Sequence, residues 1–171
     1  PRGSPVYVME SVAMQAEPVV ERVRSVYARD HARLWRSLYA FSGSRDVADE
    51  AAAEAFAQAL RRGDEVRDVA AWVWRSAFAI ARGELQRLRR TSADVGVHDG
   101  ADERFDDGDL SGLLARLASL SAADRELLVL CHVGGWKPGD LAAVLGEPAG
   151  RVRVRLHRAT ERARKILEDD R

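Results

Sequence analysis

Apolar residues recur in this chain at intervals of three and four positions, and no stretch of it alternates apolar with polar residues. Alanine and leucine are abundant, whereas the 171 residues include only two isoleucines and two threonines. Such spacing and composition favour amphipathic helices over strands. The sequence therefore predicts an all-α fold, and its length allows one ordinary domain or two small ones.

An acidic stretch divides the predicted helices into two groups. Residues 91–111 contain seven acids, one arginine and almost no apolar side chain, so they are predicted to be a flexible linker. Pro1-Arg2-Gly3-Ser4 is interpreted as the protease-site scar of an expression tag. We divide the chain into this scar with an N-terminal tail at 1–17, a helical domain at 18–90, the acidic linker at 91–111, and a second helical domain at 112–171.

The first domain is predicted to hold three helices. They run from about Pro18 to Phe41, from Ser44 or Asp46 to about Leu60, and from about Val69 to Arg90, with a polar loop at 61–68. Trp72 and Trp74 lie two positions apart on the third helix and therefore face different directions. Trp72 is expected in the core, and Trp74 is left open between the core and a surface that stacks on bases.

The second domain carries the pattern of two helices joined by a short turn. Ser121 begins a capping pattern, and the apolar run 127–130 follows it. Pro138 suits the first turn of a short helix that ends at Leu145, and Gly146-Glu147-Pro148 then forms a tight turn. With a last helix from Ala149 to about Glu168, this pattern predicts a helix-turn-helix. Its buried positions are expected to be Leu141, Ala142, Leu145, Val152, Leu156 and Ala159.

Charge is segregated along the chain although the formal net charge is zero. Residues 149–167 carry seven basic side chains and one acid, whereas the linker is strongly acidic. Such segregation is typical of proteins with electrostatic partners of both signs. Arginine supplies 25 of the 27 basic residues, and its planar guanidinium suits phosphates and guanine edges. The last helix is therefore predicted to enter a DNA major groove, with a solvated basic helix as the alternative.

Other classes of protein are disfavoured. The single cysteine, Cys131, rules out an internal disulfide framework and fits a reducing, cytoplasmic compartment. Cys131 and His132 are adjacent but lack the spacing of metal ligands, so no metal and no cofactor are expected. Without a nucleophile, a phosphate loop or a convergent histidine, an enzyme is not expected. No apolar run is long enough to insert in a membrane.

Three segments carry a resemblance to a known family. Leu117-Ala-Ser-Leu-Ser-Ala-Ala-Asp-Arg-Glu-Leu-Leu-Val-Leu130, Gly135-Trp-Lys-Pro-Gly-Asp-Leu-Ala-Ala-Val-Leu-Gly146 and Arg151-Val-Arg-Val-Arg-Leu-His-Arg-Ala159 resemble region 4 of bacterial sigma factors. The two-lobe layout and short length are similar to the extracytoplasmic-function (ECF) group of the sigma-70 family. This resemblance implies a monomer when free that binds core RNA polymerase, promoter DNA and an anti-sigma factor.

The first domain resembles region 2 of the same family. Asp46-Val-Ala-Asp-Glu-Ala-Ala-Ala-Glu-Ala-Phe56 is similar to the acidic helix that docks on the polymerase β′ clamp, while region 4 would meet the β flap. The segment from Trp72 to Arg90 is similar to the helix that meets the −10 element. By resemblance, the loop at 61–68 would hold a flipped base of the non-template strand.

The resemblance implies three sets of contact residues. For the −35 element they are Lys137, Arg151, Arg153, Val154, Arg155, His157 and Arg158. For the −10 element they are Arg61, Arg62, Arg67, Trp74, Arg75, Arg82, Arg87, Arg89 and Arg90. For core polymerase they are Asp46, Asp49, Glu50, Glu54 and Phe56, with Phe56 packed beneath the acids.

The chain departs from the family pattern at surfaces that should be polar. Ala53 replaces a usual glutamine, Phe78 and Ala79 replace an arginine–asparagine pair, and Gly83 replaces an aspartate. Two alternatives therefore accompany the sigma hypothesis. One is a sigma-mimicking protein that sequesters an anti-sigma factor, and the other is a stand-alone helix-turn-helix regulator that dimerises on a palindromic site.

Overall fold

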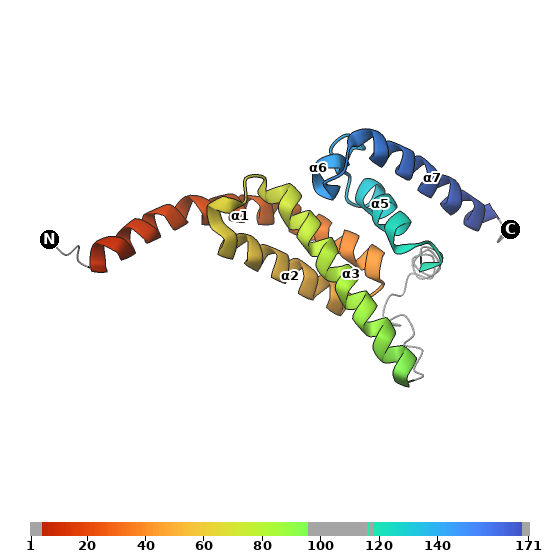
Figure 1. Ribbon diagram of the computed structural model, residues 1–171, viewed down its shortest axis with the longest axis horizontal. Coiled ribbons are helices and arrows are strands. Elements are labelled where there is room, and N and C mark those ends of the chain that lie inside the picture. Colours follow the sequence, from red (N-terminus) through yellow and green to blue (C-terminus); the bar gives the residue numbers. More distant parts are fainter. Residues whose placement is uncertain (1–4, 96–115, 117, 169–171) are drawn as a thin grey trace.

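The fold was examined in a computed structural model, which describes residues 5–95, 116 and 118–168 (Figure 1). Its described elements are α1 (Pro5–Ser42), α2 (Arg45–Arg62), the 3₁₀ turn η1 (Gly63–Glu65), α3 (Val69–Val95), α5 (Ala122–His132), α6 (Leu141–Leu145) and α7 (Ala149–Glu168). No strand occurs in these residues, so the helical fold class is confirmed. Residues 96–111, most of the predicted linker, lie outside the described part.

Two helices are longer than the sequence predicts. Helix α1 begins at Pro5 and includes Pro18, where its start was expected. Helix α3 continues from Arg90 to Val95, into the predicted linker. In both cases the added residues contain no glycine, and Pro18 removes only one backbone hydrogen bond from a long helix. The division of the chain into domains stays a prediction.

Helix boundaries elsewhere follow the local sequence. Ser44 caps α2 by accepting a hydrogen bond from the amide of Val47 at 3.3 Å, and Ser121 caps α5 in the same way through Asp124 at 3.2 Å. Gly146 ends α6 with a φ of 67°, a conformation that side chains with a Cβ adopt at an energetic cost. These caps confirm the predicted helix start at Ser121 and the predicted turn after Leu145.

Most of the buried apolar residues form one core that includes both groups of helices, and a smaller cluster lies between α5 and α7. Helices α1, α2 and α3 pack together around Leu34, Leu38 and Val73, and α5 packs on α1 while α6 packs on α3 (Figure 1). Leu127 and Leu141 of the helix-turn-helix belong to the same buried cluster. The second group of helices is therefore docked on the first, an arrangement that the sequence did not predict.

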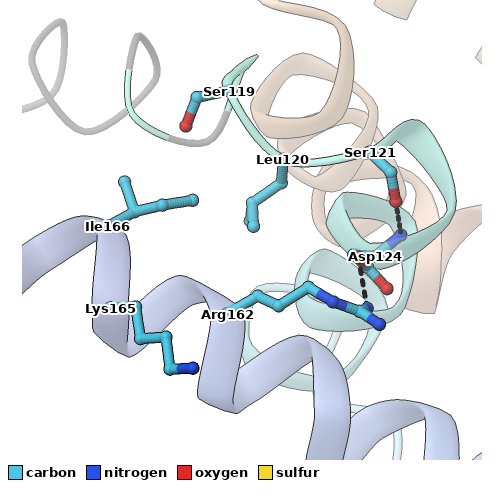
Figure 2. Close-up of a pocket in the computed structure, with 7 residues that line it drawn as sticks. All are labelled: Ser119, Leu120, Ser121, Asp124, Arg162, Lys165 and Ile166. Atoms are coloured by element: carbon cyan, nitrogen blue, oxygen red, sulfur yellow. Dashed lines mark hydrogen bonds and ion pairs between the residues drawn. The ribbon is translucent and has the colours of Figure 1, made fainter.

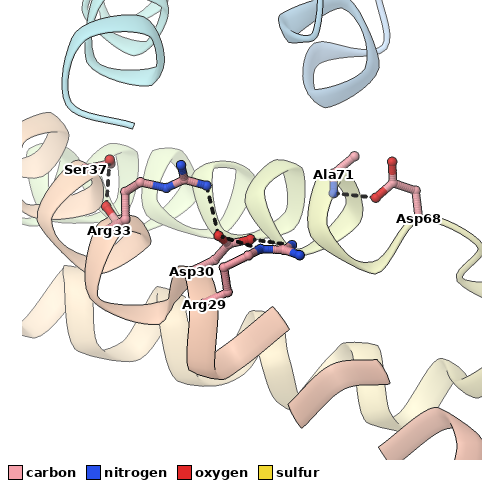
Figure 3. A network of polar contacts seen from close by, with 6 residues as sticks. All are labelled: Arg29, Asp30, Arg33, Ser37, Asp68 and Ala71. Carbon is pink, nitrogen blue, oxygen red and sulfur yellow. Dashed lines mark hydrogen bonds and ion pairs between the residues drawn. The ribbon is translucent and has the colours of Figure 1, made fainter. Parts of the chain in front are cut away.

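An acid is buried inside α1 and is neutralised there by two arginines (Figure 3). The Asp30 side chain is 1% exposed and accepts hydrogen bonds from Arg29 at 3.0 and 3.2 Å and from Arg33 at 2.9 Å. A buried carboxylate is tolerated when charged donors surround it in this way. Arg33 also lies over the ring of Trp74, which links this network to α3.

Replacing Asp30 with asparagine tests the contribution of this network to stability. Asp30→Asn should lower the free energy of unfolding by about 2 kcal/mol, because hydrogen bonds between charged groups are lost in a buried position. Urea unfolding measures the change. As a control, Glu21→Gln removes an exposed pair with Arg24 and should change stability by about 0.5 kcal/mol or less. Equal effects of the two substitutions would show that the buried Asp30 network contributes no more to stability than an exposed ion pair.

Candidate nucleic-acid interface

Helix α7 has one buried face and one basic, exposed face. Val152 and Ala159 are fully buried against α5 and α6, as the spacing predicts. The opposite face is exposed and includes Val154, which is 51% accessible to solvent. Its polar members are Arg151, Arg153, His157 and Arg158. A helix with an apolar inner face and cations outside has the form of a groove-reading element.

The cations of α7 differ in their partners. Glu147, in the turn before α7, accepts a hydrogen bond from Arg155 and lies 3.6 Å from Nε of Arg151. Arg153 and Arg158 make no hydrogen bond or ion pair with any residue in the described ranges. Glu147 thus engages two arginines of α7, Arg151 and Arg155, while Arg153 and Arg158 have no such partner in the described ranges.

The remaining cation of the predicted −35 set lies before the short helix. Lys137 is exposed, and its carbonyl accepts hydrogen bonds from the amides of Asp140 at 2.9 Å and Leu141 at 3.1 Å. The turn that carries Lys137 is therefore held by α6. The seven residues predicted for −35 recognition are all on the helix-turn-helix, and their contact with DNA stays a prediction.

Two arginines of the predicted −10 set are occupied by the helix-turn-helix. Arg75 donates to the carbonyl oxygen of Val144 at 2.9 Å and to that of Ala143. Arg82 donates to both carboxylate oxygens of Glu126, at 2.6 and 2.5 Å. In this arrangement part of each guanidinium is engaged by acceptors of the second group of helices.

Trp74, one of the residues predicted to contact DNA, is covered in the docked arrangement, and its contact with DNA stays a prediction. The residue has no exposed surface. Its ring meets that of Trp136 edge-on with centroids 5.5 Å apart, and Gly134 lies so close that an added Cβ would be 3.0 Å from it. Trp72, expected in the core, is partly buried and packs against the main core. The sequence could not separate the two because the docked α5–α6 segment is what covers Trp74.

The other cations of the predicted −10 set remain on the surface. Arg87 pairs with Glu84 at 2.7 Å, and Arg61 pairs with Glu54 at 2.6 Å. Arg62 lies over the ring of Trp72 at 5.8 Å from its centroid. Three others are exposed: Arg67, Arg89 and Arg90. Arg67 lies in the loop at 61–68, and Arg89 and Arg90 lie near the C-terminal end of α3.

The acids predicted to meet polymerase share the exposed side of α2. Asp46, Asp49 and Glu50 are exposed, and Asp49 accepts a hydrogen bond from the indole nitrogen of Trp35 at 2.6 Å. A hydrogen bond from Gln58 and, to a smaller extent, one from Arg61 lower the pKa of Glu54. The Glu54 carboxylate is therefore ionised at neutral pH.

Beneath these acids lies an aromatic group. Phe56 is buried, as expected, and contacts Tyr27 edge-on at 5.0 Å between centroids. Tyr27 in turn stacks on His31 at 4.4 Å. Tyr27, His31 and Trp35 come from α1 and were missed by the sequence analysis, because no local pattern shows that α1 lies beside the acids of α2.

A groove between the start of α5 and the end of α7 lies outside the predicted sites (Figure 2). Leu120 and Ile166 line it, and Arg162 crosses it to Asp124 at 2.7 Å. In the described residues, no three His, Cys, Asp or Glu side chains gather where a metal ion could bind. Among the same residues, no helix has the length and apolar character that a membrane span needs.

The single cysteine reports on the packing of the two groups of helices. Burial raises the pKa of the Cys131 thiol, which slows its reaction with a maleimide at neutral pH. Arg82→Ala should loosen the docked helices and label Cys131 severalfold faster than the wild type at pH 7. Arg87→Ala, which removes a pair within α3, should label at the wild-type rate. Identical rates for all three proteins would show that Arg82 does not hold this packing.

Comparisons with known proteins agree with this architecture. Residues 111–165 match the family described as "Sigma-70, region 4". The chain is 28% identical over 176 residues to the ECF RNA polymerase sigma factor SigL of Mycobacterium tuberculosis, an alignment that covers 94% of this chain and 97% of SigL. It is 33% identical over 102 residues to the RNA polymerase sigma factor CarQ of Myxococcus xanthus, covering 56% and 59% of the two chains.

Two solved structures share the fold. CnrH, solved in complex with the cytosolic domain of CnrY, superposes with a TM-score of 0.71 at 23% identity over 93% of this chain and 96% of that one. The sigma factor RpoE of Bartonella quintana, solved with the anti-sigma factor NepR, gives a TM-score of 0.64 at 23% identity over 86% and 98%. The shared fold, the matched region and the full-length relative agree, and together they support an ECF sigma factor of the sigma-70 family.

Proposed function

We propose that this sigma factor binds core RNA polymerase through the exposed acids of α2 and reads the −35 element through α7. The observation that carries the proposal is the basic, exposed face of α7 opposite the buried Val152 and Ala159. An α-helix fits the DNA major groove, and arginines beside it grip phosphates. Nothing in this role requires covalent chemistry, and we place the protein in the cytoplasm as a monomer when free.

The partners of each arginine suggest which of them read bases. Arg153 faces outward beside the exposed Val154, so this pair suits a guanine edge and a thymine methyl group. Arg151 and Arg155 share the carboxylate of Glu147 and lie on the flank, where they suit phosphates. Arg164, near the end of the helix, pairs with Glu161 at 3.6 Å and suits a phosphate as well.

We also propose that the docked arrangement is incompatible with −10 binding. Arg75 and Arg82 are held by α6 and α5, so their full engagement with a promoter strand would require the two groups of helices to separate. One of the solved relatives was captured with an anti-sigma factor. By analogy, such a partner for this chain would stabilise the docked form.

Run-off transcription with purified core polymerase over a library of upstream DNA fragments tests the proposed function. Transcripts that depend on this protein would reveal both promoter elements. Tight core binding without transcripts would mean that melting needs an activator. If core polymerase does not bind, the sigma-mimicking alternative becomes the better account. A stable dimer on a palindromic site without polymerase would instead favour the stand-alone regulator.

Two arginines of α7 should respond differently to substitution. Arg153→Ala should weaken −35 binding by the holoenzyme about tenfold and relax preference at one base pair, because a bidentate base contact is lost. Arg164→Ala should leave sequence preference unchanged and reduce the slope of log K against log[salt] by about 1. Binding titrations at several salt concentrations measure both. Unchanged binding in both variants would show that α7 is not the helix that reads the −35 element.

A further inference from the structure

Glu147 lies in the turn that joins α6 to α7 (Figure 1). It is the only acidic residue between Asp140 and Glu161, a stretch that holds four arginines. The backbone of this turn is fixed, because the amide of Glu147 donates a hydrogen bond to the carbonyl oxygen of Ala142 at 3.1 Å and Pro148 follows with a restricted φ. The Glu147 carboxylate is therefore presented from a rigid turn beside the start of α7.

The Glu147 carboxylate holds two arginines on one side of α7. Its Oε1 accepts a hydrogen bond from Arg155, whose side chain is 31% exposed. Its Oε2 lies 3.6 Å from Nε of Arg151, too far for a hydrogen bond, and the Arg151 side chain is 71% exposed. Steps of about 100° per residue place both arginines on the same side of the helix. The pair with Arg155 is thus the tight one and the pair with Arg151 the loose one.

This pairing lowers the positive charge that α7 offers to DNA. The formal charge of the two arginines, +2, falls to +1 when the carboxylate that they share is included. The carboxylate also lies just before the N-terminal end of α7, where the helix dipole is positive and favours an anion. A phosphate that approaches Arg155 meets the negative charge of Glu147 in contact with it, so the phosphate gains less from that arginine.

One oxygen of the carboxylate has no donor. Oε2 of Glu147 is buried and accepts no hydrogen bond from the described residues, and a buried acceptor without a donor is costly. The stability of the turn therefore gains little from a charge at this position. Glutamine has the same shape, and its amide oxygen could still accept the hydrogen bond from Arg155. The property that distinguishes glutamate here is its negative charge.

We propose that Glu147 is an internal counter-ion of the reading helix, which limits the contribution of Arg151 and Arg155 to phosphate binding. This inference rests on the proposed function, because the charge has this effect only if α7 binds DNA. Phosphate contacts position a protein on DNA but carry no sequence information. A reading helix with fewer of them binds less tightly to DNA that lacks the −35 element.

Salt titrations of promoter binding test the proposal. Holoenzyme is assembled from core polymerase and the full chain, and its Kd is measured for a promoter fragment recovered by run-off transcription. Glu147→Gln should steepen the slope of log K against log[salt] by about 1, because about one more phosphate contact forms. Binding should tighten about five- to tenfold at about 0.1 M salt, and the two titrations should converge toward about 1 M.

Three further measurements identify the source of the gain. DNA with a replaced −35 element should show the same gain, since phosphates carry no sequence information. In an Arg155→Ala background, Glu147→Gln should tighten binding by no more than about twofold, because the arginine that it would release is absent. Glu147→Asp retains the negative charge and should keep a salt slope close to that of the wild type.

Glu168→Gln is the matched control, because it removes the same charge from the far end of α7. Glu168 is exposed and lies about 25 Å along the helix from Arg151, whereas the Debye length is about 8 Å at physiological salt. This variant should bind like the wild type at every salt concentration. An equal gain in Glu168→Gln would show that net charge matters rather than the pairing of Glu147, and it would overturn the proposal.

Weaker binding or an unchanged salt slope in Glu147→Gln would also overturn the proposal, and a misfolded variant cannot imitate a gain in affinity. A loss confined to the intact −35 element would show instead that Glu147 contacts a base. The proposed function fails separately. If the wild-type holoenzyme shows no preference for the −35 element, both ideas fall. If it shows that preference and Glu147→Gln has the wild-type slope, only the role of Glu147 is wrong.

Discussion

The docking of the helix-turn-helix on the three-helix bundle depends on one aromatic contact, between Trp74 of α3 and Trp136 of the turn after α5. Gly134 permits the close approach, and the Arg75 and Arg82 contacts flank it. Neither indole nitrogen has a hydrogen-bond partner among the described residues, and a buried unpaired donor costs about 1–3 kcal/mol. The contact therefore combines two buried aromatic rings with two unpaired donors, which suits the proposed separation of the two groups of helices.

Local patterns predicted most of the helices and the helix-turn-helix. Ser121 caps α5, Gly146 ends α6 in the left-handed region, and Val152 and Ala159 are buried, because each of these features depends on residues within a few positions of one another. Helical periodicity alone predicted which face of α7 is buried and which is exposed. The outer end of α3 was missed because no glycine or proline stops the helix before Val95, and that of α1 because the helix continues through Pro18, where it was expected to begin.

Features that depend on distant segments could not be predicted. The full burial of Trp74 follows from the α5–α6 segment, far along the chain, that covers one side of α3. The pair of Arg82 with Glu126 is of the same kind, as is the hydrogen bond from Trp35 to Asp49. Helical periodicity identifies which positions are outward on an isolated helix, but it does not say which outward positions another domain will cover.

Arg75 also has a consequence for the helix-turn-helix itself. The carbonyl oxygens that it binds, those of Ala143 and Val144, belong to the C-terminal end of α6, where the helix dipole is negative and backbone acceptors lack partners within the helix. Helix α6 has only five residues, too few to be stable by itself. The bundle thus acts as a C-cap supplied from another part of the chain. When the two groups of helices separate, this short helix loses its cap and becomes a preferred place for local unfolding and amide exchange.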